Sequence, residues 1–150
     1  MSKSSIVNFL EGKGSHPRYG IVDQILMRDD SFWERNHDFI QWLFPLDEAS
    51  RSVRNAPVLT HECVASIRLS DEAKKSFLKA TKRYKEFLAR SQKWRTGYDH
   101  NQLRISRVIK SLRLLISDEA ANSFKYWVAG ELGDNIDKIH PDARKHWRLA

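Results

Sequence analysis

Apolar residues recur at spacings of three and four along most of this chain, which is the period of an amphipathic α-helix. No segment shows the sustained alternation of a surface β-strand bounded by hairpin turns. The clearest helical pattern runs from Ser70, a favoured capping residue, to about Lys93. Its predicted core face consists of Ala73, Phe77, Ala80, Thr81, Tyr84, Phe87, Leu88 and Ser91. We expect this segment to be the longest helix.

The same spacing predicts further helices over about 4–11, 19–27, 31–44, 101–116 and 117–131, with a short one after Thr60 and a last one from Pro141 through Trp147. Ser31 and Glu34 have the spacing of a capping box at the start of the third of these. Residues 46–57 are expected to form a surface connection. The sequence therefore predicts an all-α fold, a single irregular bundle of six to eight helices that forms one domain over residues 1–150.

Two aromatic or apolar positions, Trp42 and Cys63, are each open to two interpretations. Trp42 falls on the polar side of the 31–44 helix, so it either packs against the first two helices or is exposed to a partner. Cys63 lies in a short apolar run and is expected to be a small buried residue rather than a reactive nucleophile. The other four tryptophans are expected in or around the core.

Net charge is +7, and its distribution is uneven. Residues 71–113 hold 13 basic and 4 acidic side chains, a net of +9, and the flanking segments are each close to neutral. Two interpretations fit this excess of positive charge: a helix face that is simply solvated, or a surface that binds nucleic acid or another polyanion. The residues proposed for that surface are Lys75, Lys79, Lys82, Arg83, Arg90, Lys93 and Lys110.

Asn36 and His37 fall on the apolar arc of the predicted 31–44 helix, where burial without partners would cost about 1–3 kcal/mol each. The 101–116 segment offers partners, because Asn101 lies on its apolar face and Arg104 and Arg107 at one flank. We therefore predict a polar network between the two segments.

This polar network has three interpretations. It is a hydrogen-bond cluster that specifies the fold, or a ligand-binding pocket built from Asn36, His37, Asn101, Arg104 and Arg107, or a site in which His37 acts as a general base. Two arginines in a pocket favour an anionic ligand, because a guanidinium pairs bidentately with carboxylate or phosphate.

Other chemistry finds little support in the sequence. The six histidines include no pair at the i, i+4 spacing of a metal-binding helix, and His61 with Cys63 is too small a ligand set. No glycine loop for phosphate or nucleophile elbow is present. We expect no metal, no cofactor and no enzymatic activity. With no signal peptide or membrane-spanning segment evident, we expect a cytoplasmic protein, with nuclear association if the source is eukaryotic.

Two segments carry a resemblance to a known family. Residues 34–46 read ERNHDFIQWLFPL and residues 100–112 read HNQLRISRVIKSL. Both resemble, in the same order, segments of the conserved domain of the opioid growth factor receptor family, with a lysine-rich helix between them. The resemblance covers about residues 20–148 and identifies the chain as a compact, single-domain member.

Members of that family in animals are described as receptors for an enkephalin-type peptide growth factor, associated with the nuclear envelope. The resemblance therefore implies a non-enzymatic domain that binds a peptide, a protein or an anionic group. It brings no catalytic residues with it. Nucleic-acid or other polyanion binding through residues 71–113 is the alternative, and an uncharacterised enzyme is a third.

Overall fold

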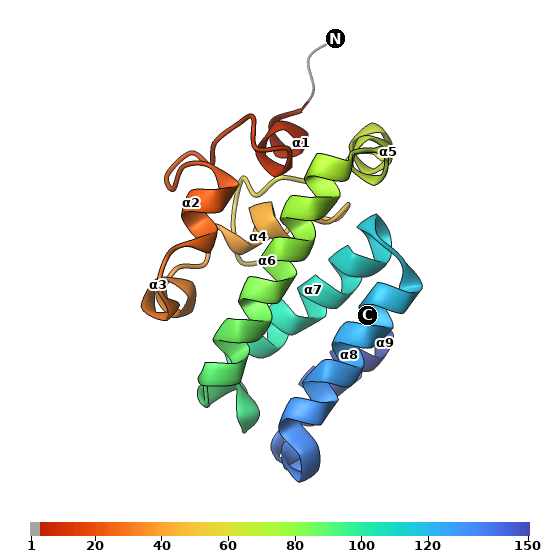
Figure 1. Cartoon of the computed structure of the whole chain (residues 1–150). Coiled ribbons are helices and arrows are strands. Elements are labelled where there is room, and N and C mark those ends of the chain that lie inside the picture. Colours follow the sequence, from red (N-terminus) through yellow and green to blue (C-terminus); the bar gives the residue numbers. More distant parts are fainter. Residues whose placement is uncertain (1–3) are drawn as a thin grey trace. The chain divides into compact units, whose positions relative to one another are not determined.

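A computed structural model describes residues 4–150 and contains, in that range, nine α-helices and two short 3-10 helices (Figure 1). The elements are α1 Ser5–Leu10, α2 Val22–Leu26, α3 Asp30–Arg35, α4 Ile40–Leu43, α5 His61–Leu69, α6 Asp71–Arg90, η1 Lys93–Arg95, α7 His100–Leu115, α8 Asp118–Leu132, η2 Gly133–Lys138 and α9 Pro141–Leu149. The predicted all-α fold is confirmed. The helix count exceeds the predicted six to eight because one predicted helix is divided in two.

The chain divides into two compact units, one ending at Tyr84 and the other beginning at Lys85. The boundary falls inside α6, so this long helix contributes its first part to the first unit and its last turn and a half to the second. That the two units act as one domain stays a prediction.

The core of the first unit is rich in aromatic rings. Trp33 lies 5.0 Å from Phe39 and 6.2 Å from Tyr84 between ring centroids, and Phe44 lies 5.8 Å from Phe77. All five side chains are fully buried. Rings of this size bury large apolar areas, and the edge-to-face pairs among them add about 0.5–1.5 kcal/mol each. The aromatic residues of α3 and α6, with the two that flank α4, therefore hold the first unit together.

The helix predicted over residues 31–44 is not continuous. α3 ends at Arg35, Asn36 has an extended backbone with φ −100° and ψ 143°, and α4 begins only at Ile40. The predicted capping box is also wrong, because Asp29 caps α3 by accepting a hydrogen bond from the Phe32 amide at 2.9 Å. Helical-wheel positions drawn through residues 36–39 therefore do not apply, and His37 is exposed instead of buried.

Local glycine conformation and aromatic packing account for two other features of the first unit. α2 is shorter than the predicted 19–27 because Gly20 has a φ of +88° and its carbonyl accepts from the His16 amide at 2.7 Å, forming a tight turn. Trp42 packs edge-on against Phe9 of α1, with ring centroids 5.4 Å apart, which confirms the packing interpretation for its contact with α1. Cys63 is buried as predicted.

The lysine-rich helix α6 follows the prediction closely. The Ser70 hydroxyl oxygen accepts from the Ala73 amide at 3.1 Å and its proton goes to Glu11 Oε2 at 2.7 Å, so the cap also attaches α6 to the end of α1. The predicted core face is buried except for Ser91, which is half-buried. The helix ends at Arg90, three residues before the predicted end.

The second unit is built around α7, which packs most extensively against α8 and then against α9. Its buried apolar residues are Ile105, Val108, Ile109, Leu112 and Leu115 from α7, Ala121, Phe124, Val128 and Leu132 from α8, and Ala143 and Trp147 from α9. Ser117 caps α8 as predicted, accepting from the Ala120 amide at 3.0 Å. No helix within residues 4–150 combines the length and apolar character that crossing a bilayer requires.

Candidate functional site

A polar cluster of His16, Arg18, Tyr19, Asn36 and Asp38, here called the His16 cluster, joins the loop before α2 to the segment between α3 and α4. His16 is 5% exposed. Its Nδ1 accepts from the Arg18 amide at 3.0 Å, so this nitrogen carries no proton, and its Nε2 donates to the Asp38 carbonyl at 2.8 Å. The two bonds fix one neutral tautomer of the ring.

The same cluster pairs the Asp38 carboxylate with two donors. Arg18 Nη1 donates to Asp38 Oδ2 at 2.8 Å, and the Tyr19 hydroxyl donates to Asp38 Oδ1 at 2.8 Å and lies 3.2 Å from Asn36 Oδ1. The Asn36 amide nitrogen in turn donates to the Phe32 carbonyl at 3.1 Å. These bonds pull residues 36–39 out of a helical path, because their polar groups are satisfied by the preceding loop and not by the next helical turn.

Two pKa values in the cluster follow from this geometry. Burial acts to raise the pKa of Asp38, but the hydrogen bonds from Tyr19 and Arg18 outweigh it, and the pKa lies below its usual value. The pKa of Tyr19 is raised by burial, by its hydrogen bond to Asp38 and by the charge of that carboxylate. At neutral pH the cluster therefore contains an ionised Asp38 and a protonated Tyr19.

Asp38 makes the stability of the protein depend on pH. Because its pKa is lower in the folded state, its contribution is fully present above the unfolded pKa and disappears as the pH falls through the folded pKa. We expect Asp38→Asn to lower the free energy of unfolding by about 1 kcal/mol at pH 7, and by nothing measurable at about pH 2. Urea titrations at the two pH values measure this. An equal loss at both would mean that carboxylate charge plays no part.

The predicted ligand-binding residues are distributed over the two units. In the first unit Asn36 is half-buried and belongs to the His16 cluster, and His37 is exposed. In the second, Asn101 and Arg104 are buried on α7 and bonded to each other, Arg104 Nη1 to Asn101 Oδ1 at 3.3 Å, and Arg107 is half-buried. The network between the two groups stays a prediction.

The predicted polyanion-binding residues differ in how they are used. Lys75, Lys79 and Lys82 are exposed on α6, and so are Arg90, Lys93 and Lys110 farther along the chain. Arg83 is different, because its side chain is only 12% exposed. Its guanidinium binds the Leu26 and Arg28 carbonyls at 3.2 and 2.9 Å and the Asp30 carboxylate at 2.9 Å. We therefore assign Arg83 to the packing of the first unit.

Lys75, Lys79 and Lys82, here called the lysine face, form the candidate binding surface of the first unit. Their spacing of four and three places them on one side of α6. Leu78, which is 47% exposed, lies in the same row. Among the residues that the structure describes, none of these three ammonium groups forms an ion pair with a carboxylate, and the acidic residues at the start of the helix pair elsewhere, Glu72 with Lys13 and Asp71 with Lys74. Glu86, one turn after Lys82 on α6, is an exposed carboxylate at the end of this face.

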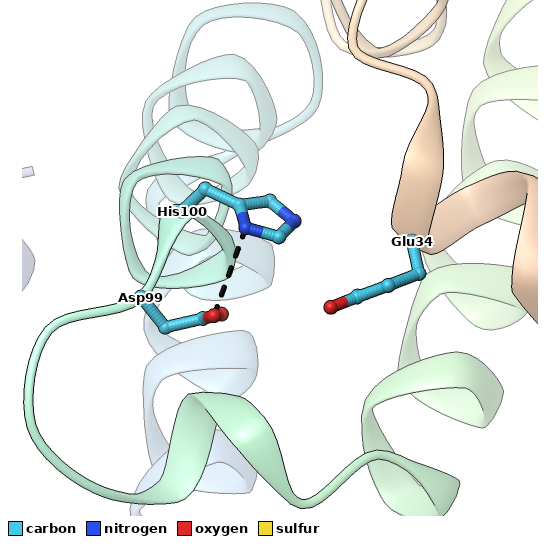
Figure 2. Close-up of side chains that lie close together, drawn as sticks. All are labelled: Glu34, Asp99 and His100. Carbon is cyan, nitrogen blue, oxygen red and sulfur yellow. Dashed lines mark ion pairs between the residues drawn. The ribbon is translucent and has the colours of Figure 1, made fainter.

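Asp99 and His100 stand at the start of α7 (Figure 2). The Asp99 carboxylate caps the helix by accepting from the Asn101 amide at 3.0 Å, and His100 Nδ1 lies 3.6 Å from the same carboxylate. Glu34, drawn in the same figure, belongs to the first unit. Within the second unit, Asp99 and His100 supply only two potential metal ligands, whereas a catalytic zinc site has three protein ligands. We therefore do not assign a metal site to this pair.

The sequence interpretation missed His16, although a signal for it exists. His16-Pro17-Arg18 and His140-Pro141-Asp142 share the order His-Pro-X. In both, His Nδ1 accepts from the amide two residues later, at 3.0 Å in the first and 3.1 Å in the second. The ring nitrogen thus acts as an asparagine side chain does in an Asx-turn. The His-Pro dipeptide, which occurs twice in the sequence, could therefore have predicted both turns.

The fold and this site define an all-helical protein in which a polar cluster around the buried His16 holds the segment between α3 and α4. The model of the opioid growth factor receptor conserved region matches residues 17–97, which include residues 34–46 and most of the His16 cluster. The chain belongs to the opioid growth factor receptor family. The match ends before the second segment, residues 100–112.

Curated relatives agree with this assignment. Opioid growth factor receptor-like protein 1 of Mus musculus and the protein of the same name of Rattus norvegicus are each 34% identical to the chain over 96 aligned residues. The alignments cover 53% of this chain and 20% of each relative, so the chain spans about a fifth of those proteins. No solved structure shows significant similarity to it.

Proposed function

We propose that this chain is a non-enzymatic binding domain, and that the lysine face of α6 binds an acidic segment of a peptide or protein partner. The observation that carries the proposal is the set of three exposed lysines on one side of α6, none of which forms an ion pair with a carboxylate among residues 4–150. The relatives are named as receptor-like proteins, which favours a binding role over catalysis.

Electrostatics support an anionic partner for this surface. Lys75 to Lys82 span about 10 Å of helix, so an extended acidic segment can contact all three ammonium groups at once. Each contact in water is weak, about 1 kcal/mol, and three together give a salt-sensitive interaction. Leu78 offers an apolar contact in the same row.

The environments of two histidines, His16 and His37, support a non-enzymatic role. Both ring nitrogens of His16 are engaged by backbone groups, so this ring has no site left to take up a substrate proton. His37, the residue considered for a general base, is exposed to solvent, whereas general bases act in sites that orient a substrate and exclude water.

Neutralising the lysine face tests the proposal. We expect the triple variant Lys75→Gln, Lys79→Gln and Lys82→Gln to bind a fluorescein-labelled polyglutamate peptide about tenfold or more weakly than the unmodified protein in low-salt buffer. Fluorescence anisotropy measures the difference. A matched control, Arg51→Gln, Lys138→Gln and Lys145→Gln, removes the same charge from other exposed positions and should bind nearly as well as the unmodified protein.

Equal weakening in both triple variants would reduce the interaction to net charge and contradict the assigned surface. Labelled single-stranded RNA and double-stranded DNA are titrated in parallel at low and high salt. Tighter binding of nucleic acid than of the acidic peptide, with the same dependence on the lysine face, would favour polyanion binding over a protein partner.

A further inference from the structure

The second unit contains a cavity of about 580 Å³ walled by α7, α8, η2 and α9. Small-molecule sites in proteins have volumes of about 300–1,000 Å³. The cavity lies entirely within residues 109–148, outside the residues 17–97 that the family shares and apart from the lysine face. Nothing in the binding function proposed above makes use of it.

The lining residues are of two kinds. The apolar ones are Ile109, Val128, Ala129, Ile136 and Trp147. The polar ones are all cations, Lys125 from α8 and Arg144 and Arg148 from α9, and no acidic side chain lines the cavity. An apolar wall beside a group of cations is complementary to a molecule with an apolar body and a single anionic group.

These cations have little compensation from the protein. Lys125 Nζ donates to the Arg148 carbonyl at 3.2 Å, a neutral partner, and burial followed by the nearby Arg113 lowers the pKa of Lys125. Arg144 Nη1 lies 3.7 Å from Asp137, whose side chain is 88% exposed. The Arg144 Nε–H is a buried donor that finds no acceptor among residues 4–150. An anionic oxygen in this cavity would supply what these groups lack.

We propose that this cavity binds an amphipathic carboxylate of the fatty-acid class, with its hydrocarbon chain on the Ile109–Trp147 wall and its carboxylate at Lys125, Arg144 and Arg148. A hydrocarbon chain fits this lining better than a peptide does. The lining side chains offer donors and no acceptor, and the Trp147 indole N–H is already bonded to the Gln102 carbonyl at 2.9 Å. Peptide N–H groups would find no side-chain partner there, and a hydrocarbon chain needs none.

The test uses decanoate below its micelle-forming concentration. Calorimetric titration of the full chain should show binding of decanoate. Decanol should bind at least tenfold more weakly because it lacks the negative charge, and acetate should not bind because it lacks the hydrocarbon chain. Amide chemical shifts in a nitrogen-15 spectrum should move at the lining residues.

Two variants and a control locate the site. Ala129 is exposed on α8 and lines the cavity, so Ala129→Phe should place a ring in the space and weaken decanoate binding at least tenfold without removing any core side chain. Arg148→Glu, also at an exposed position, should weaken binding at least tenfold. Lys145→Glu lies on the same helix outside the lining and should bind as the unmodified protein does.

Several results would overturn the proposal: no decanoate binding, binding unchanged in both Ala129→Phe and Arg148→Glu, or chemical-shift changes confined to residues outside the cavity. A short peptide with a free carboxyl-terminal leucine is titrated as well. If the peptide binds at the cavity and decanoate does not, the site recognises peptides and the fatty-acid class is wrong.

Discussion

Alanine in place of Arg83 should lower the free energy of unfolding by about 3 kcal/mol. The Arg83 guanidinium holds the segment between α2 and α3 through the Leu26 and Arg28 carbonyls and the Asp30 carboxylate. It also covers the Trp33 ring at 4.9 Å from the centroid. Removing it leaves these acceptors without their donors and uncovers a core tryptophan. Urea denaturation followed by circular dichroism gives the value.

Conservative variants at Arg83 separate its hydrogen bonds from its packing. Arg83→Met keeps a long chain over the indole but donates nothing, and we expect a loss of about 2 kcal/mol. Arg83→Lys retains the charge, but an ammonium cannot reproduce the fork of the guanidinium, so we expect a loss between zero and that of Met. If Arg83→Met is as stable as the unmodified protein, the three hydrogen bonds contribute nothing to stability, and Arg83 acts only through the packing of its aliphatic side chain against Trp33.

A second large effect is expected at His16, where alanine should lower the free energy of unfolding by about 3 kcal/mol. The substitution removes the acceptor of the Arg18 amide and the donor to the Asp38 carbonyl. It also leaves a space between Tyr19 and Trp42, whose ring centroids lie 4.7 and 5.2 Å from that of His16. Thermal and urea unfolding measure the loss.

The variants His16→Asn and His16→Gln separate the contributions of the two His16 hydrogen bonds to stability. Asn can place an oxygen near Nδ1 and retain the bond from the Arg18 amide, and Gln can place its nitrogen near Nε2 and retain the bond to the Asp38 carbonyl. Each should recover part of the loss. His16→Phe keeps the ring packing and neither bond, so a stability equal to that of the unmodified protein would show that the two bonds are dispensable.

The sequence predicts which side chains of the candidate site are exposed, but not which of them form hydrogen bonds within the protein. The exposed lysines of α6 follow from helical period alone, because a helix that buries Phe77 and Tyr84 must expose Lys75, Lys79 and Lys82. Arg83 lies next to that face in sequence, yet its acceptors are more than fifty residues away. Which cation is solvated and which is bonded depends on tertiary neighbours that periodicity cannot supply.

The cavity of the second unit shows the same limit. Its lining residues come from four elements, and except for Ile136 of η2 they read in the sequence as ordinary parts of amphipathic helices. A cavity arises where packed helices fail to fill the space between them, and this depends on interhelical geometry. No pattern along one helix records it.

The sequence by itself determined the all-α class, the caps Ser70 and Ser117, the buried face of α6 and the family, because these depend on local spacing and on matched motifs. Only the tertiary structure decided that the 31–44 segment breaks. Asn36 and Asp38 exchange the hydrogen bonds of a continuous helix for bonds to Tyr19, Arg18 and His16, about twenty residues earlier. Helical propensity is a preference of a few tenths of a kcal/mol per residue, and a set of long-range hydrogen bonds, most of them partly buried, outweighs it.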